Sequence, residues 1–154
     1  MGKIDKRLQE LGIDVPEPAA PVANYVGWVR TGNIVFTSGQ VPLRDGKFHF
    51  KGKVGGEVSV EQAIEATQLC AVNVISQIKG ALDGDLDRVR RVVKLVVFIN
   101  GVPEFNEHPK VANGASDLMV EVFGDKGKHA RSAVGAGSLP LNVAVEVEAV
   151  FEVE

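Results

Sequence analysis

Hydrophobic and polar residues alternate most regularly at the end of the chain, over residues 143–154. Successive side chains of a β-strand point to opposite faces of its sheet, so this segment predicts a strand with one core face and one polar face. The core face would carry Val143, Val145, Val147, Ala149, Phe151 and Val153, and the polar face Glu146, Glu148, Glu152 and Glu154 together with Ala144 and Val150. Residues 91–100 instead form a nearly continuous apolar run, which is typical of a central strand covered on both faces.

A helical period marks two other segments. Ser59, followed three residues later by Gln62, forms a capping box, and apolar residues continue at helical spacing to Leu82, shortly before Gly84. The second helix begins with Pro109 in its first turn and stops at Gly124. Each helix has an apolar stripe that needs a flat partner, so both are expected on a sheet.

Shorter elements complete the predicted order. Residues 3–11 are expected to form an amphipathic helix, and residues 15–21, with three prolines, an extended connector. Residues 25–30 and 33–37 predict a β-hairpin, residues 47–50 a short third strand, and residues 131–136 a strand that precedes the final one. The order β-β-(β)-α-β-α-β-β predicts an α/β (α+β) fold with a mixed sheet and both main helices on one of its faces.

Composition narrows the function classes. The 154 residues suit one domain, and a net charge of −3 gives no basic surface for a nucleic acid, which is therefore an unlikely partner. A single cysteine excludes an internal disulfide, and three scattered histidines give no metal-ligand spacing, so no metal is expected. The charged N-terminus and the lack of a long apolar run favour a cytoplasmic protein without membrane contact.

Two charged residues near the C-terminus are the main candidates for chemistry. Arg131 opens one predicted strand and Glu146 lies in the next, so a cross-strand ion pair is one interpretation. The other is that the guanidinium of Arg131 binds a ligand carboxylate through two parallel hydrogen bonds, with Glu146 placing a water molecule. Ser38 and Gly39 follow a strand and form either a ligand-binding turn or a plain one.

Other residues leave alternatives open. Tyr25 and Trp28 lie near the sheet face that the helices leave uncovered, which must meet water or another subunit, or they are ordinary core aromatics. Cys70 lies on the buried stripe of the long helix, which indicates inert packing. The sequence contains no Ser-His-Asp order, dinucleotide fingerprint or phosphate-binding loop.

Several segments in register resemble the reactive intermediate deaminase family (RidA/YjgF). They are residues 33–42, the strand residues 97–99, Ala130-Arg131-Ser132, Leu139-Pro140 and residues 145–149. The resemblance covers residues 22–153, so residues 1–21 are expected to form an N-terminal helix and connector, and residues 22–154 the family's domain. It implies a fold like that of Bacillus chorismate mutase, a homotrimer, and ligand clefts between subunits.

The resemblance also implies an activity: hydrolysis of enamine or imine intermediates, such as small 2-imino acids, to 2-keto acids and ammonia without a cofactor. Arg131 would bind the substrate carboxylate and Glu146 would be the cleft glutamate. Substrate contacts would come from Tyr25 of the adjacent subunit, Ser38, Gly39, Ala133 and Asn113. An alanine at 133, where typical members often have cysteine, leaves open a non-catalytic trimeric binder of small carboxylates; an endoribonuclease or translation inhibitor is a third, less favoured alternative.

Overall fold

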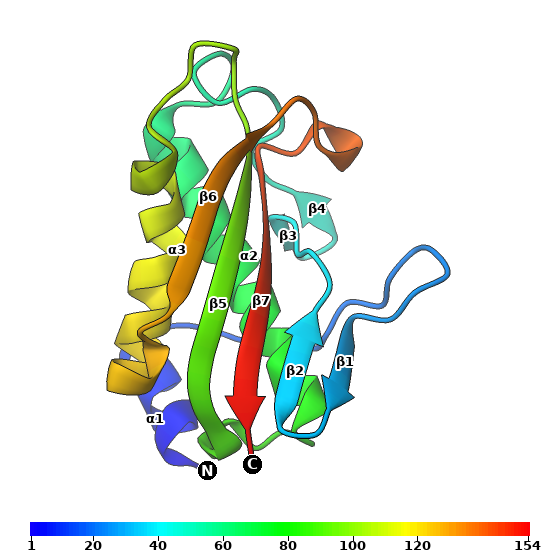
Figure 1. Cartoon of the computed structure of the whole chain (residues 1–154), viewed down its shortest axis with the longest axis vertical. Helices are drawn as coiled ribbons and strands as arrows, with labels where there is room; N and C mark the ends of the chain where they lie inside the picture. Colours follow the sequence, from blue (N-terminus) through cyan, green and yellow to red (C-terminus); the bar gives the residue numbers. More distant parts are fainter.

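The computed structural model describes residues 1–154 and has a five-stranded sheet in the order β1-β2-β7-β5-β6. Its strands are β1 (Trp28–Thr31), β2 (Ile34–Thr37), β5 (Val89–Asn100), β6 (Ala130–Ala136) and β7 (Val145–Val153). Strands β5 and β6 are parallel and the other neighbours are antiparallel. Helices α2 (Val60–Ala81) and α3 (His108–Phe123) lie behind the sheet, on one of its faces (Figure 1). The predicted fold class is confirmed.

Strand β7 confirms the predicted alternation, because its odd-numbered residues from Val145 to Val153 are buried and its even-numbered ones are half-exposed. Strand β5 corrects the other prediction. Val92, Leu95, Val97 and Ile99 are buried under the helices, but Val93 is 36% exposed and Phe98 is half-exposed. The apolar run of β5 is therefore covered on one face only, and its second apolar face remains open within a single chain.

The strand order corrects the expectation that β6 and β7 are neighbours. β5 lies between them and pairs with β6 on one edge and with β7 on the other. The reason is the connection between β5 and β6, which passes through α3, because a helical crossover returns the chain as a parallel neighbour of the strand that it left. β7 then takes the free edge of β5 and joins it to the N-terminal hairpin.

Both main helices begin and end where the sequence predicts. The Ser59 hydroxyl accepts a hydrogen bond from the Gln62 amide at 3.1 Å, and the Gln62 side chain accepts one from the Ser59 amide at 3.0 Å. Helix α3 has Pro109 in its first turn and ends at Gly124, whose φ of +63° suits glycine. The two helices approach closely at Gly114, where a Cβ atom would lie 2.5 Å from the Ile64 carbonyl oxygen.

The N-terminal hairpin is shorter than predicted. β1 begins at Trp28, so Tyr25 lies in the preceding loop, and Gly32 turns the chain with a φ of +56°. Trp28 is half-buried and packs against the core beside Gly80 of α2, so its core interpretation holds. The short third strand is also corrected: β3 (Leu43–Arg44) and β4 (Lys47–Phe48) pair only with each other and form a separate two-stranded hairpin.

Helix α1 (Lys3–Glu10) and the connector that follows pack on the same core as the rest of the chain. Leu8 is buried, and the amides of Lys3 and Ile4 each donate to the Asp87 carboxylate at 2.8 Å. The connector is irregular, as predicted, and Ser76 of α2 donates to the Pro16 carbonyl at 2.7 Å. No helix of the chain combines the length and the apolarity that crossing a bilayer needs.

Candidate functional site

Arg131 lies on the edge strand β6 and points toward α3. Its register partner is Leu95, a buried residue under the helices, and parallel partners point to the same face. Its Nη1 donates to Asn113 Oδ1 at 2.7 Å and to Ser116 Oγ at 3.1 Å. Asn113 and Ser116 are three residues apart on α3 and therefore share one side of the helix. The structure thus brings together Arg131 and Asn113, two of the residues predicted for the site.

These two hydrogen bonds use one edge of the guanidinium and leave another free. Nη1 carries two hydrogens, and both have an acceptor on α3. Nε and Nη2 make no hydrogen bond or ion pair within the chain, although Arg131 is only half-exposed. The N–H groups of Nε and Nη2 are parallel, which is the geometry that matches the two oxygens of a carboxylate.

Ser116 extends this cluster to a residue that the sequence analysis did not single out. His129 lies just before β6, and its Nε2 is 2.9 Å from Ser116 Oγ while its Nδ1 is 2.6 Å from the Gly127 carbonyl oxygen. The link joins α3 to the turn that follows it, so no sequence period reveals it. Only the position of His129, two residues before Arg131, could have drawn attention to it.

Ala133 lies on the same side of β6 as Arg131, two residues further along the strand. Its register partner Val97 is fully buried, and Ala133 itself is half-buried and packs against the core. The next residue on this side is Gly135, whose Cβ would lie 3.1 Å from Nε2 of His108. Small residues therefore follow Arg131 along the strand, and Ala133 brings no reactive group to the site.

Glu146 belongs to a second cluster, on the open face of the sheet. Its register partner is the half-exposed Phe98, and its carboxylate lies over Gly39, where a Cβ would be only 2.5 Å from Glu146 Oε2. Ser38 is next to Gly39; its hydroxyl donates to the Val26 carbonyl at 2.6 Å and ties this cluster to the loop that carries Tyr25. The predicted residues Ser38, Gly39 and Glu146 are thus neighbours in space.

Burial raises the pKa of Glu146, and repulsion from Glu148 on the same face raises it further. The carboxylate has no hydrogen bond or ion pair within the chain. A partly desolvated carboxylate without a partner takes up a proton more readily than an ordinary glutamate does. Glu146 is therefore suited to accept a proton from a bound water molecule.

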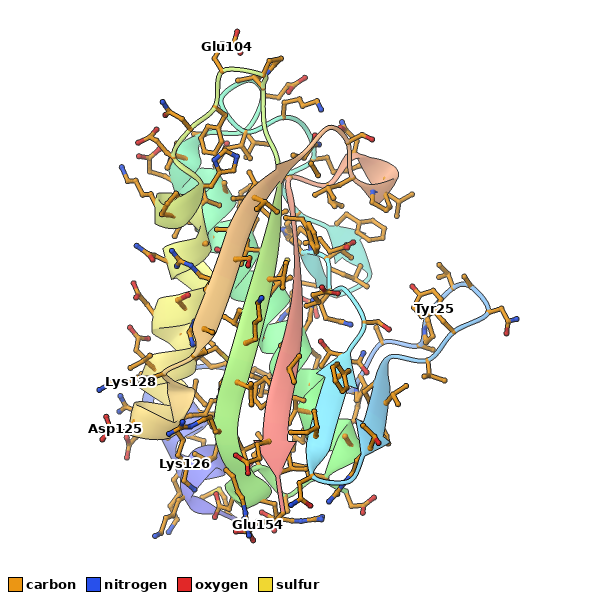
Figure 2. All side chains as sticks on the ribbon, in the orientation of Figure 1. Tyr25, Glu104, Asp125, Lys126, Lys128 and Glu154 are labelled. Carbon is orange, nitrogen blue, oxygen red and sulfur yellow. The ribbon has the colours of Figure 1, made fainter.

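The two clusters do not meet within one chain. Arg131 and Glu146 are separated by β5 and lie on opposite faces of the sheet, so their predicted cross-strand ion pair is wrong. Tyr25 is also remote from Arg131: Figure 2 shows it on the loop that projects beyond β1, opposite the side where Lys128 leads into β6. Tyr25 is 54% exposed and has no hydrogen bond from its hydroxyl group.

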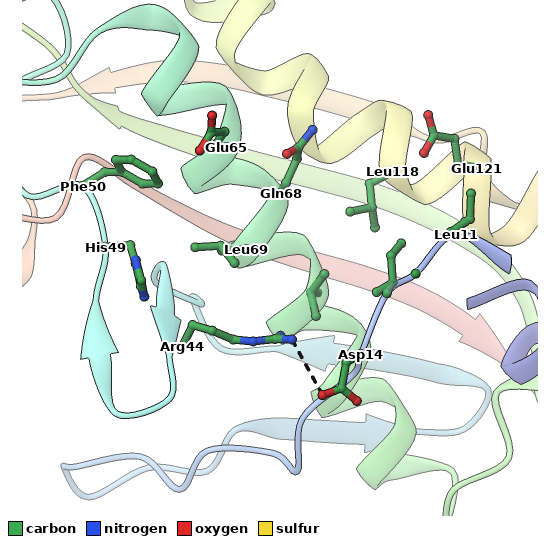
Figure 3. Close-up of a pocket in the computed structure, with 13 residues that line it drawn as sticks. Leu11, Asp14, Arg44, His49, Phe50, Glu65, Gln68, Leu69, Leu118 and Glu121 are labelled. Carbon is green, nitrogen blue, oxygen red and sulfur yellow. Dashed lines mark ion pairs between the residues drawn. The ribbon is translucent and has the colours of Figure 1, made fainter. Parts of the chain in front are cut away.

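A broad cavity of about 730 Å³ lies elsewhere, between the residues after α1, the β3–β4 hairpin and the outer sides of α2 and α3 (Figure 3). Arg44 and Asp14 form an ion pair of 3.9 Å across it, and none of the predicted site residues lines it. Cys70 is fully buried in the core, and burial raises the pKa of its thiol well above the ordinary value. No three His, Cys, Asp or Glu side chains are grouped to hold a metal ion.

Comparison with known proteins gives one family and several relatives. The sequence model of the family described as "YjgF/chorismate mutase-like, putative endoribonuclease" matches residues 5–153. Protein TCP17 of Trypanosoma cruzi is 49% identical over 152 residues, which cover 98% of this chain and 94% of that protein. A 2-iminobutanoate/2-iminopropanoate deaminase of Dermatophagoides farinae is 28% identical, with 92% of this chain and 95% of that protein covered.

Among solved structures, protein Atu1372 of Agrobacterium tumefaciens, of unknown function, is 48% identical to this chain and superposes with a TM-score of 0.92. The superposition covers 98% of this chain and 92% of the Agrobacterium protein. The similarity therefore includes α1 and the connector as well as the sheet and its two helices.

Proposed function

Because the chain belongs to the YjgF/chorismate mutase-like family, we propose that it hydrolyses small 2-imino acids to 2-keto acids and ammonia in a cleft between two copies of the chain. The observation that carries the proposal is the free Nε–Nη2 edge of Arg131, which is held by Asn113 and Ser116 and matches a carboxylate. A relative with 28% identity is named as a deaminase of this kind.

The separation of the two clusters supports a site shared between copies. Arg131 lies on the exposed edge strand, whereas Glu146, Ser38 and Gly39 lie on the open face with Tyr25 beyond it. The open face also carries exposed apolar side chains, among them Val29 (53% exposed), Phe36 (48%) and Val134 (44%). A neighbouring copy would cover these side chains and bring its Glu146 cluster to Arg131, and we propose the family's homotrimer as the arrangement.

The chemistry needs little beyond a fixed substrate and a placed water, because the carbon of a protonated imine is already electrophilic. Arg131 holds the substrate carboxylate. The oxygen of water bonds to C2 while the π electrons of the C=N bond move to nitrogen, and Glu146 takes a proton from the water. Glu146 then returns that proton to nitrogen, and the C–N bond breaks with its electron pair leaving on ammonia. The hydroxyl oxygen forms the C=O bond of the 2-keto acid and releases its proton, which ammonia takes up to become ammonium.

The direct test is a coupled assay in which 2-iminopropanoate is generated in the presence of the protein. We expect the protein to accelerate ammonia release, and the Arg131→Ala variant to lose most of the acceleration. Arg90→Ala is the matched control, because Arg90 is an exposed arginine at the start of β5, five residues before Leu95, the register partner of Arg131. No acceleration by the wild type, or equal activity of Arg131→Ala, contradicts the proposal.

One observation favours a second candidate, a trimeric binder of small carboxylates without turnover. Ala133 places no reactive side chain beside Arg131, although the arginine and its supporting residues are present. Calorimetry with 2-oxobutanoate or benzoate would then show binding that depends on Arg131, while the imine assay shows no acceleration. Ribonuclease activity has less support, because Glu146, Glu148 and Glu152 on the open face would repel phosphates.

A further inference from the structure

His129 is joined to Arg131 by a continuous chain of hydrogen bonds through Ser116. The distances are 3.1 Å from Arg131 Nη1 to Ser116 Oγ, 2.9 Å from Ser116 Oγ to His129 Nε2, and 2.6 Å from His129 Nδ1 to the Gly127 carbonyl oxygen. Arg131, Ser116 and His129 are all half-exposed. Each of these contacts is short enough to be a real hydrogen bond.

The direction of each bond follows from which groups can donate. A guanidinium only donates, so Ser116 Oγ accepts from Arg131 and its own proton points away from the arginine. A carbonyl oxygen only accepts, so Nδ1 of His129 carries a proton and donates to Gly127. Nε2 of a neutral imidazole is then an acceptor for the Ser116 hydroxyl. Each hydrogen bond in the chain is thereby satisfied with His129 neutral and protonated on Nδ1.

The backbone around Gly127 fixes this arrangement. Gly127 is buried against the last turns of α3, and a Cβ there would collide with the Met119 carbonyl oxygen. Its carbonyl oxygen is consequently held at one place relative to α3, which also carries Ser116 and Asn113. The charged neighbours have other partners: Lys128 pairs with Asp125 at 3.1 Å in solvent, and Lys126 donates to the Val89 carbonyl at 3.2 Å.

We infer that His129 is a positioning residue for Arg131: through Ser116 it fixes the rotation of the guanidinium, so that the Nε–Nη2 edge faces the carboxylate ligand. Asn113 alone would hold Nη1 at one point and leave the guanidinium free to turn about that contact. The second contact, at Ser116, removes this freedom. The inference rests on the proposed function of Arg131 as the carboxylate-binding residue, and it adds how that residue is oriented.

The test compares carboxylate binding by calorimetry, with 2-oxobutanoate as the probe, in variants that keep different parts of the imidazole. His129→Gln can place an amide oxygen near the position of Nε2 and still accept from Ser116, whereas His129→Asn reaches only the position of Nδ1. We expect affinity to fall roughly tenfold in His129→Asn, His129→Ala and Ser116→Ala, and to stay within about twofold of the wild type in His129→Gln. Both His129→Gln and His129→Ala lose the hydrogen bond to Gly127, so a difference in affinity between these two variants reports the contact with Ser116 alone.

Nitrogen-15 NMR of the wild-type histidines gives an independent measurement. We expect His129 as the Nδ1-protonated tautomer, and a change in its Nε2 resonance when 2-oxobutanoate binds. An Nε2-protonated neutral ring, or equal affinities of all His129 variants while Arg131→Ala loses binding, overturns the inference and leaves the proposed function intact. If Arg131→Ala binds 2-oxobutanoate as the wild type does, the carboxylate site itself is refuted.

Discussion

Arg131 and Glu146 occupy the same sheet but not the same face of it. Their register partners on β5 are Leu95 and Phe98, an odd number of residues apart, so one side chain points toward the helices and the other toward the open face. No rotation of either side chain joins them through β5. If the two residues serve one reaction, they must do so across two copies of the chain.

This geometry predicts complementation between two inactive variants. Arg131→Ala and Glu146→Gln should each lose imine hydrolysis, but a mixed population assembled from both should regain it. In a ring of three, where each site takes one residue from each of two neighbouring chains, every ring that contains both variants has one competent site, so roughly a third of the sites in mixed rings should be active. The measurement is the ammonia-release assay on co-expressed chains with two different affinity tags, purified over both.

A site contained within one chain would give no activity in the mixture, because each chain would lack one of its two residues. Arg131→Ala mixed with wild type is the control for assembly. Sedimentation of the wild type tests the ring itself, and a monomer at assay concentrations contradicts the shared cleft.

Gly39 is predicted to be required for the position of the Glu146 carboxylate. A Cβ at residue 39 would lie 2.5 Å from Glu146 Oε2, so Gly39→Ala must displace the carboxylate, while its φ does not require glycine. A displacement of about 1 Å in a reacting group lowers turnover by roughly 100-fold, so we expect a 10- to 100-fold loss of kcat/KM with little change in the thermal midpoint. Gly137→Ala, where a Cβ meets nothing within 4 Å, should retain wild-type activity.

The sequence predicted the elements better than their contacts. Capping chemistry and apolar spacing are local, which is why α2, α3 and the alternation of β7 agree with the structure. The apolar run of β5 predicts cover on both faces, and this prediction is wrong for the single chain, because an open apolar face has the same sequence pattern as a buried one. Whether that face is covered by another copy is a property of the assembly, which a periodicity cannot show.

The residues of the candidate site are also predicted better than the contacts between them. Arg131 and Asn113 are both predicted for the site, and Arg131 Nη1 lies 2.7 Å from Asn113 Oδ1. Glu146, Ser38 and Gly39 form one cluster. The pairing of Arg131 with Glu146 failed because it assumed that strands adjacent in sequence are adjacent in the sheet. His129 was missed because its hydrogen bonds to Ser116 and Gly127 depend on where α3 ends, which only the folded chain defines.

Removing the charge of Glu146 is predicted to stabilise the fold at neutral pH. Burial and repulsion from Glu148 raise the pKa of Glu146 in the folded chain. As pH rises, the unfolded chain therefore loses this proton at a lower pH than the folded chain does. Stability therefore falls as pH rises from the ordinary glutamate pKa through the raised one. The thermal midpoint of Glu146→Gln should exceed that of the wild type at pH 7, and the difference should disappear below about pH 4.

Glu104→Gln is the control for the loss of one negative charge. Glu104 lies in an exposed loop, so this substitution should leave the thermal midpoint almost unchanged, both at pH 7 and below about pH 4. A Glu146→Gln protein that is less stable than the wild type at pH 7 would mean that the carboxylate has a partner in the folded protein.

The docking of α1 is predicted to depend on Asp87 in the opposite sense. Hydrogen bonds from the amides of Ile4 and Lys3 lower the pKa of Asp87, so its contribution to stability is present above the ordinary carboxyl pKa and is lost as pH falls through the lowered value. Asp87 is exposed, so solvent screens its hydrogen bonds to the start of the helix, and Asp87→Ala should destabilise the protein by only about 0.5–1 kcal/mol at pH 7, or ~2–3 °C in the thermal midpoint. Hydrogen exchange should become faster over residues 3–10 and stay unchanged in α3.

The difference in thermal midpoint between Asp87→Ala and the wild type should shrink toward pH 3. Asp117→Ala is the control, because Asp117 is an exposed carboxylate without such contacts, and its midpoint should show no comparable dependence on pH. Equal exchange rates in Asp87→Ala and wild type would show that the apolar contacts of Leu8 hold α1 by themselves.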